Sequence, residues 1–258
     1  MIRKGKLLVL EGLDGSGKET QSKLLVDRLN KEGYKAIRVS FPNYGQPQCA
    51  MVEEYLKGNY KNQYEYREDY ITFIKQVSMM YSMDRVGTFI SPIKDGKSLI
   101  QLLHEGYVLI CDRYTTSNIL HQGAMFPGYD KKNDPEIKNY IKWIQHIEYK
   151  HLGLPRPDYI MFLNLHISRY MENIEKRGQE KDIHENMNHL YRVYKFKSTP
   201  VKYCGWDNIY CTANDGHYTM RTIEDIHEEI YNKVVNKLQE LEEIRLAHEA
   251  MSLEVVNQ

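Results

Sequence analysis

A stretch near the N-terminus, KLLVLEGLDGSGKETQSKLL (Lys6–Leu25), combines residue types and spacings that suit phosphate binding. Gly12, Gly17 and Lys18 match the pattern G-x-x-x-x-G-K-[ST], in which backbone N–H groups and the lysine contact phosphate oxygens. The pattern lies between an apolar run and a predicted helix, whose N-terminus favours an anion. A chance glycine-rich turn is the weaker alternative. We therefore predict that these residues bind a nucleoside triphosphate: Gly12, Leu13, Asp14, Gly15, Ser16, Gly17, Lys18, Glu19 and Thr20.

The last position of this pattern departs from the rule, because Glu19 stands where a Ser or Thr hydroxyl normally binds Mg²⁺. Thr20 cannot simply replace that hydroxyl, since the next residue of a helix points about 100° away. Two arrangements are open. In the first, which we favour, Glu19 reaches the metal itself or through water, because carboxylates suit Mg²⁺. In the second, Glu19 turns outward at the helix N-terminus, where a negative charge is favourable, and Asp112 with Asp14 holds the hydrated ion.

Asp112 and Arg113 form a second candidate site, at the end of the apolar run YVLICD. A carboxylate that ends a buried strand near the loop is placed like a Walker-B acid. Arg113 follows at the carboxyl edge of the sheet, where ligands bind in such folds. Asp14 would be costly beside phosphates unless it meets a metal or a substrate hydroxyl. A surface salt bridge is the alternative for the Asp-Arg pair, but the buried strand before it favours function. The predicted metal ligands are Asp112, Glu19 and Asp14.

Strand-like apolar runs alternate with helical patterns along the chain, which predicts βαβ units and a parallel sheet covered on both faces. The predicted strands are Lys6–Glu11, Ala36–Phe41, Tyr107–Asp112, Tyr159–Leu165 and Asp207–Thr212. The predicted helices are Glu19–Lys31, Tyr66–Val86, Pro92–His104, Pro135–Lys150, Ser168–Lys176 and a last one from Thr222. The expected fold class is therefore α/β. One domain is expected over residues 1–240, followed by a charged helical extension or tail at 241–258.

Composition narrows the classes of partner and compartment. The chain has 258 residues, with 35 Lys plus Arg and 35 Asp plus Glu, so the balance favours neither nucleic acid nor an anionic membrane. Its 4 cysteines show no C-x-x-C spacing, which fits reduced thiols better than a disulfide framework or a zinc site. No run approaches the roughly 18 apolar residues of a membrane span. We expect a soluble, cytoplasmic protein.

These motifs together resemble the thymidylate kinase family of P-loop nucleoside-monophosphate kinases. Members carry G-x-D-G-[AS]-G-K-[ST]-T-Q and D-R-[YF]-x-x-S-x-x-A-Y-Q, and this chain has GLDGSGKETQ and DRYTTSNILHQ. The segments FPNYGQP, MMYSMDR and RPDYIMFLNL also match, and the lid-like EKRGQEKDIHE follows them. The resemblance covers roughly Lys6 to Val235. It implies a P-loop kinase fold, a five-stranded parallel sheet flanked by helices, with a mobile lid at about 175–185.

The resemblance implies phosphoryl transfer from ATP to dTMP, giving dTDP and ADP for dTTP synthesis, with Mg²⁺ as cofactor. It also implies a homodimer through the helix around Tyr66–Val86, with ATP and dTMP as the other partners. Arg85 and Arg113 would clamp the monophosphate, and Tyr81 would stack on the base unless it is ordinary core packing. The implied catalytic residues are Lys18, Asp14, Arg113, Arg177 and Lys181. The implied dTMP-binding residues are Asp14, Phe41, Tyr44, Tyr81, Arg85, Arg113, Ser117, Asn118, His121 and Gln122.

Several positions depart from the family pattern. Gly15 stands where some members have a catalytic Arg, so we expect Arg177 and Lys181 of the lid to supply the cation, although a solvated charged loop is the usual state of such a run. Asn43, Leu120 and His121 replace an Arg, a small Ala and a Tyr on the acceptor side, and the segment 126–155 is longer than usual. Two alternatives therefore stay open: a kinase for another (deoxy)nucleotide or deoxynucleoside, and a non-catalytic nucleotide-binding regulator, for which Glu19 is the best argument.

Overall fold

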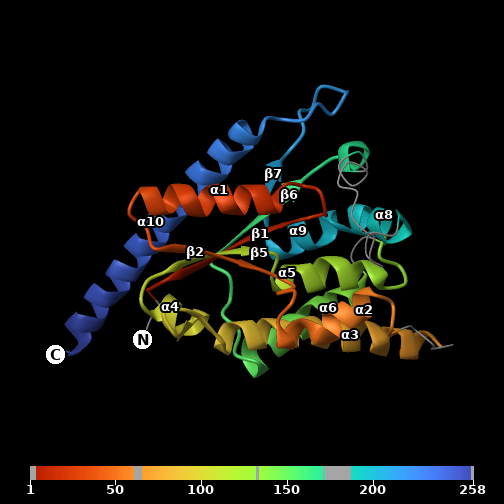
Figure 1. The fold of residues 1–258 in the computed structure, drawn as a ribbon, viewed down its shortest axis with the longest axis horizontal. Coiled ribbons are helices and arrows are strands. Elements are labelled where there is room, and N and C mark those ends of the chain that lie inside the picture. Colours follow the sequence, from red (N-terminus) through yellow and green to blue (C-terminus); the bar gives the residue numbers. More distant parts are fainter. Residues whose placement is uncertain (1–3, 61–65, 132–133, 171, 173–186, 257–258) are drawn as a thin grey trace.

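The computed structural model describes residues 4–60, 66–131, 134–170, 172 and 187–256 (Figure 1). Its centre is a sheet of 5 parallel strands in the order β2-β5-β1-β6-β7. The strands are β1 (Lys6–Gly12), β2 (Ala36–Ser40), β5 (Val108–Asp112), β6 (Tyr159–Asn164) and β7 (Asp207–Tyr210). The α/β prediction and all five predicted strands are confirmed.

Helices cover both faces of this sheet, and alternation along β1 decides which face each residue serves. Leu8 and Leu10 pack in one apolar cluster with Leu25 of helix α1 (Lys18–Lys31) and Ile230 of helix α10 (Ile223–Val256). Leu7 and Val9 point the other way, into a cluster that includes residues of helices α3 (Arg67–Ile90) and α4 (Leu99–His104). Figure 1 shows α1 above the sheet and α3 and α4 below it. β1 is therefore buried throughout, which is why it reads as a continuous apolar run.

The described helices have the following bounds. They are α1 (Lys18–Lys31), α2 (Ala50–Leu56), α3 (Arg67–Ile90), α4 (Leu99–His104), α5 (Thr115–Ser117), α6 (Pro135–His146), α8 (Met187–Phe196), α9 (Ser198–Cys204) and α10 (Ile223–Val256). Short 3₁₀ or π-helical turns are η1 (Pro47–Cys49), η2 (Asn118–Gln122), η3 (Gly123–Met125) and η4 (Ile147–His151). Within the described ranges, no helix is long and apolar enough to cross a membrane.

The predicted helix Pro92–His104 is wrong in its first half. Strands β3 (Pro92–Lys94) and β4 (Lys97–Ser98) form a small antiparallel hairpin there, and α4 begins only at Leu99. Asp95 and Gly96 have φ angles of 51° and 74°, which is the left-handed pair that a tight hairpin turn requires. An Asp-Gly pair is a strong hairpin signal, and it outweighs the helical spacing around it.

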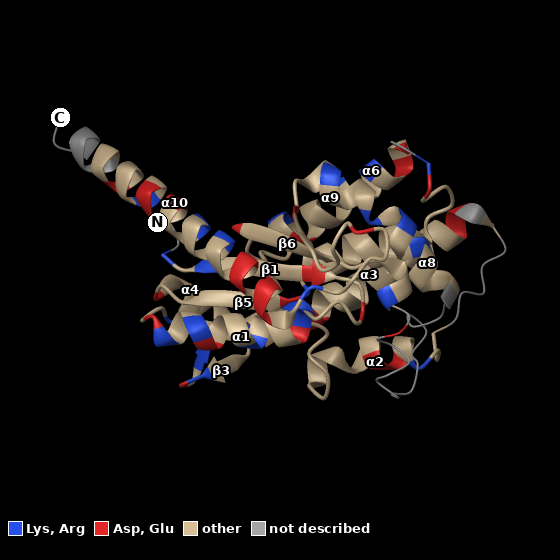
Figure 2. Cartoon of the chain, turned by 90° about the horizontal axis from the view of Figure 1, so that it is seen from above, with Lys and Arg blue, Asp and Glu red and all other residues tan. Residues whose placement is uncertain are grey.

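Other predicted helices are confirmed with changes at their ends. The helix Pro135–Lys150 is present as α6 followed directly by the π-helical turn η4. Thr222 caps α10 as expected, because its hydroxyl accepts a hydrogen bond from the N–H of Asp225 at 3.0 Å. α10 continues past residue 240 without a break and extends beyond the rest of the domain (Figure 2). The predicted helix Ser168–Lys176 and the lid at 175–185 lie largely or wholly outside the described residues.

Candidate active site

The loop between β1 and α1 has the backbone that the glycine pattern predicts. Gly12 has a φ of 153°, and a Cβ there would lie 2.7 Å from the Ser16 hydroxyl and 2.8 Å from the Leu163 carbonyl oxygen. Gly17 precedes α1 with a φ of 90°, in the left-handed region that favours glycine. Only glycine fits Gly12 without displacing its neighbours. Thr20 belongs to the predicted ATP-binding set, and its side chain is exposed on α1.

Lys18 is folded back into this loop. Its ammonium group donates hydrogen bonds to the carbonyl oxygens of Gly12 and Leu13 at 2.9 and 2.8 Å, and it lies 3.8 Å from Asp14. Burial, and secondarily the nearby Arg113, lowers the pKa of Lys18 to about 8. The side chain therefore stays mostly protonated at neutral pH and presents a cation at the phosphate-binding loop.

Arg113 and Asp14 meet beside the loop, as the sheet order requires. β1 and β5 are parallel neighbours, so their carboxyl ends, and the residues that follow, lie at the same edge. The guanidinium of Arg113 forms an ion pair with Asp14 and lies 2.9 Å from Nε2 of His121. Arg113 has a φ of 67°, which is rare for a residue other than glycine and is typical of functional sites. The strand that ends at Asp112 lies beside the phosphate-binding loop, as the sequence predicts.

Glu11 is a site residue that sequence reasoning did not identify. It is fully buried and accepts hydrogen bonds from the N–H of Gly12 at 2.9 Å and the hydroxyls of Thr116 and Ser117 at 2.6 and 2.7 Å. Its carboxylate also lies 3.7 Å from Arg113. Glu11 therefore joins the phosphate-binding loop to α5. The signal was present, because a charged residue ends the otherwise apolar strand KLLVLE.

The predicted metal ligands do not converge in this structure. Asp112 is 6% exposed at the end of β5 and pairs with Arg38, at 2.6 Å between Nη2 and Oδ2. Glu19 pairs with Lys23 at 2.7 Å, and both side chains are about 60% exposed. The carboxylate of Glu19 turns outward on the first turn of α1, as in the second of the two arrangements considered, and which residues hold the metal stays a prediction. Among the described residues, no group of three or more His, Cys, Asp or Glu could hold a metal ion.

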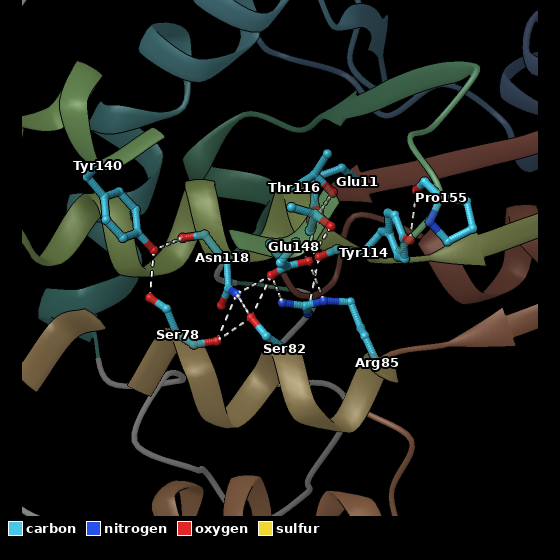
Figure 3. A network of polar contacts seen from close by, with 12 residues as sticks. Glu11, Ser78, Ser82, Arg85, Tyr114, Thr116, Asn118, Tyr140, Glu148 and Pro155 are labelled. Carbon is cyan, nitrogen blue, oxygen red and sulfur yellow. Dashed lines mark hydrogen bonds and ion pairs between the residues drawn. The ribbon is translucent and has the colours of Figure 1, made fainter. Parts of the chain in front are cut away.

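Arg85 lies in a buried polar network on the acceptor side (Figure 3). Its Nε donates to Oε2 of Glu148 at 3.0 Å and its Nη2 donates to Oε1 at 2.5 Å, and the two side chains are 1% and 0% exposed. This two-pronged pair occupies the fork that a phosphate would need. Glu148 takes the fork of Arg85 in this structure, which argues against Arg85 as a phosphate clamp, and the clamp role of Arg113 stays a prediction.

Asn118 and Gln122 lie at the two ends of η2 and are almost fully buried. Asn118 donates to the carbonyl oxygen of Ser78 at 3.0 Å and to Glu148 at 2.8 Å. Within the described part of the chain, Oδ1 of Asn118 and Nε2 of Gln122 have no hydrogen-bond partner. Buried polar atoms of this kind are rare and commonly await a ligand or water. Their contact with dTMP stays a prediction.

The remaining predicted acceptor residues differ in how accessible they are. Phe41 is 3% exposed and packs against Phe89 and Tyr114, so it is a core residue. Tyr44 is 57% exposed, and Tyr81 is partly buried with its ring edge-on to Tyr55. The position of Tyr81 is therefore compatible either with core packing or with stacking on a base.

Two further predicted residues take partners nearby. His121 stacks on His189, with ring centroids 5.7 Å apart, and Ser117 is held by Glu11. Arg177 and Lys181 lie outside the described residues, so their catalytic role stays a prediction.

Comparisons with known proteins identify the family of this chain. The family model described as "Thymidylate kinase" matches residues 10–206. Thymidylate kinase from Brachyspira hyodysenteriae is 32% identical over 200 residues, covering 76% of this chain and 81% of that protein. The enzyme of the same name from Plasmodium falciparum is 28% identical over 242 residues, covering 93% and 95%. The solved structure of thymidylate kinase from Candida albicans shares the fold, with a TM-score of 0.64, 22% identity and coverage of 92% and 95%. The chain belongs to the thymidylate kinase family.

Proposed function

We propose that this protein transfers the γ-phosphoryl group of ATP to dTMP. An oxygen of the dTMP phosphate attacks the γ-phosphorus, the bond from that phosphorus to the β–γ bridging oxygen breaks, and ADP leaves as dTDP forms. The observation that carries the proposal is the meeting of Lys18 and Arg113 at one edge of the sheet. Beside it lies a buried segment in which, among the described residues, Asn118 Oδ1 and Gln122 Nε2 have no hydrogen-bond partner. Family membership supports the same reaction.

The chain contributes mainly position and charge, as phosphoryl transfer requires. The loop amides and Lys18 hold the phosphates of ATP. Arg113 receives the acceptor phosphate, whose negative charge can replace Asp14 as its partner. Glu11 fixes the positions of the phosphate-binding loop and α5 relative to each other, because it contacts both. This arrangement holds the attacking oxygen and the γ-phosphorus in line.

Mg²⁺ fits the chemistry of two of the predicted ligands. Asp112 and Asp14 supply the hard carboxylate oxygens that Mg²⁺ prefers, one at the end of β5 and one in the phosphate-binding loop. When bound, the ion neutralises charge on the ATP phosphates. Because Asp112 pairs with Arg38 and Asp14 with Arg113, we infer that phosphates and water provide most of the coordination.

The lid, the oligomer and the compartment complete the proposal. We infer that Arg177, with Lys181, supplies the transition-state cation that an Arg at position 15 would provide and that Gly15 does not. Replacing Arg177 with Ala should lower kcat by about 100-fold or more and change KM for dTMP little, since the contact forms mainly in the transition state. A kcat near wild type would move the role to Lys181 or another residue. A cytoplasmic homodimer through α3 is expected from the family resemblance.

An acceptor panel tests the proposed function directly. ADP release is measured with ATP and each of dTMP, dUMP, dCMP, AMP, GMP and thymidine. The Candida albicans relative is described as having broad substrate specificity, so several acceptors are needed. We expect dTMP to give the highest kcat/KM, with dUMP weaker because a methyl-sized pocket contributes about 1–3 kcal/mol. Equal turnover of a purine monophosphate, preference for thymidine, or no turnover at all would contradict the proposal.

A further inference from the structure

His121 of η2 bridges two side chains that come from other parts of the chain. Its Nε2 lies 2.9 Å from Nη1 of Arg113, and its Nδ1 lies 3.4 Å from Nε2 of His189 on α8. The ring of His121 is 6% exposed and lies at an angle of 19° to that of His189. Both nitrogens of this imidazole are therefore engaged, one with a cation and one with a second imidazole.

The guanidinium of Arg113 decides where the hydrogen of His121 lies. An arginine side chain stays protonated and has only N–H donors, so the nitrogen that it contacts must be an acceptor. Nε2 of His121 therefore carries no hydrogen. The neutral ring keeps its one N–H on Nδ1, which donates to Nε2 of His189. If the ring were turned over, carbon atoms would face both partners, so these contacts allow one orientation only.

His189 is held in place by the packing of α8. Arg192, about one turn further along α8, donates to the carbonyl oxygen of Ala124 in η3 at 2.8 Å. A Cβ on Gly123 would lie 2.7 Å from the ring of Phe196, so α8 and η3 are in close contact. Because η3 follows η2 directly, this packing fixes His189 relative to His121.

The two ends of the Arg113 guanidinium have partners of different kinds. Nη2 pairs with the carboxylate of Asp14, which is 25% exposed. Nη1 contacts the imidazole of His121 and lies 3.7 Å from the buried carboxylate of Glu11. A neutral acceptor such as His121 orients a cation without cancelling its charge. A phosphate can therefore replace Asp14 at one end while His121 still holds the other.

We propose that His121 and His189 are a pair of positioning residues that hold the guanidinium of Arg113 for the phosphate group of the acceptor. The inference rests on the proposed function. His189 receives the hydrogen of Nδ1, and His121 presents a bare Nε2 to Arg113. The Tyr that the family usually has at position 121 carries a single hydroxyl and could not contact both partners from opposite sides of its ring. The pair therefore contributes to affinity for the phosphate and little to affinity for the nucleoside.

The protonation of His121 can be read in the ligand-free protein by nitrogen NMR with isotope-labelled histidine. This measurement distinguishes a ring nitrogen that carries a hydrogen from one that does not, and the spectrum of His121→Phe identifies the signals by their loss. We expect a neutral ring at neutral pH, with its hydrogen on Nδ1. A hydrogen on Nε2, in a neutral or a doubly protonated ring, would overturn the inference, because Arg113 could not donate to that atom.

Binding of dTMP and of thymidine then isolates the phosphate contact. The ratio of the Kd of thymidine to the Kd of dTMP, measured by calorimetry, reports what the phosphate group contributes. His121→Phe should lower this ratio by about 10-fold or more, since a hydrogen bond to a charged group is lost, and should change the Kd of thymidine by less than about 3-fold. His189→Phe, which keeps an aromatic ring without an acceptor, should lower the ratio by about 3- to 10-fold. His189→Gln, whose Oε1 can accept from Nδ1, should recover most of that loss.

His151→Phe is the matched control, because it makes the same change at an exposed histidine of η4 whose ring contacts that of His146. It should keep the ratio within about 2-fold of wild type. An unchanged ratio in His121→Phe, or equal weakening of thymidine and dTMP, would overturn the role of the pair. An unchanged ratio in His189→Phe, or the same loss in His189→Gln, would remove His189 from it. A wild-type protein that does not phosphorylate dTMP would instead refute the proposed function, and it would leave the protonation of His121 to be read as before.

Discussion

The phosphate-binding edge and the acceptor pocket place their charges in opposite ways. At the edge, Arg113 and Asp14 are 14% and 25% exposed, and their ion pair faces the loop that contains Lys18. In the pocket, Arg85 and Glu148 are 1% and 0% exposed and fully paired with each other. A highly charged ligand requires cations whose partners it can replace. A nucleobase is recognised through hydrogen bonds to neutral groups, and these require protein donors and acceptors that are held in fixed positions.

This difference predicts that mutations in the two regions affect different properties. Changes at the edge should reduce activity and leave stability nearly intact. Water can compensate the partly exposed Asp14 and Arg113, and Asp14 keeps Arg113 as its partner when the buried Lys18 is lost. Changes in the pocket should reduce stability first, because an unpaired charge there has no access to water.

The largest expected effect is at Lys18. Lys18→Met should lower kcat/KM for ATP by about 1,000-fold or more, since a buried cation that contacts phosphates is lost. The free energy of unfolding, measured with urea, should change by less than about 1 kcal/mol. Lys23→Met, one turn further along α1 and exposed, is the control and should keep full activity. A Lys18→Met protein that unfolds as easily as a pocket variant would remove the contrast between the regions.

Glu148→Leu should have the largest effect on stability. We expect the free energy of unfolding to fall by about 3–5 kcal/mol, because Arg85 is left buried and charged without a partner. Adding Arg85→Met should recover most of this loss, as apolar side chains then replace the whole pair. The measurement is urea unfolding of the wild-type, single and double variants. A single variant as stable as wild type would show that water reaches Arg85 after all.

Asp14→Asn should have an intermediate effect on activity. It keeps the shape of the side chain but removes its charge from Arg113 and from any metal, so we expect kcat to fall about 10- to 100-fold. Stability should change by no more than about 1 kcal/mol, as for other partly exposed pairs. Steady-state kinetics and urea unfolding of the same preparation check both statements. Full activity would mean that Asp14 only holds Arg113 in the ligand-free state.

The smallest effect is expected at Glu19. Because its carboxylate pairs with Lys23 at the surface, Glu19→Gln should change stability by about 0.5 kcal/mol or less and leave the Mg²⁺ concentration for half-maximal activity unchanged. Glu19→Thr, which restores the hydroxyl of the usual pattern, is the companion variant. A sharply raised Mg²⁺ requirement in Glu19→Gln that is relieved in Glu19→Thr would restore Glu19 as a metal ligand.

Much of the phosphate edge could be predicted from the sequence, for a physical reason. The loop residues are contiguous, and glycines at fixed spacing are required wherever a backbone must wrap a phosphate. The alternation of strands and helices specifies a parallel sheet, and a parallel sheet brings the ends of β1 and β5 to one edge. Asp14 and Arg113 were therefore predictable neighbours, although they are 99 positions apart in the sequence.

Predictions from local sequence patterns failed where two patterns overlapped, or where a side chain could take either of two partners. The Asp95–Gly96 turn interrupts a stretch whose apolar spacing also suits a helix, so the hairpin was missed. Glu19 could satisfy its charge at a metal or with Lys23, and both choices agree with the same sequence. The decision depends on where the neighbouring side chains lie.

The acceptor pocket was decided by tertiary structure. Arg85 comes from α3, Asn118 from η2 and Glu148 from η4. Arg85 and Glu148 are 63 positions apart in the sequence, and Asn118 and Glu148 are 30 positions apart. Each residue alone has an ordinary reading as a surface charge or a polar core residue. Only the packing of these three segments removes water from all of them at once, and without water each donor must find its acceptor within the protein. That requirement fixes Asn118, and no spacing along the chain encodes it.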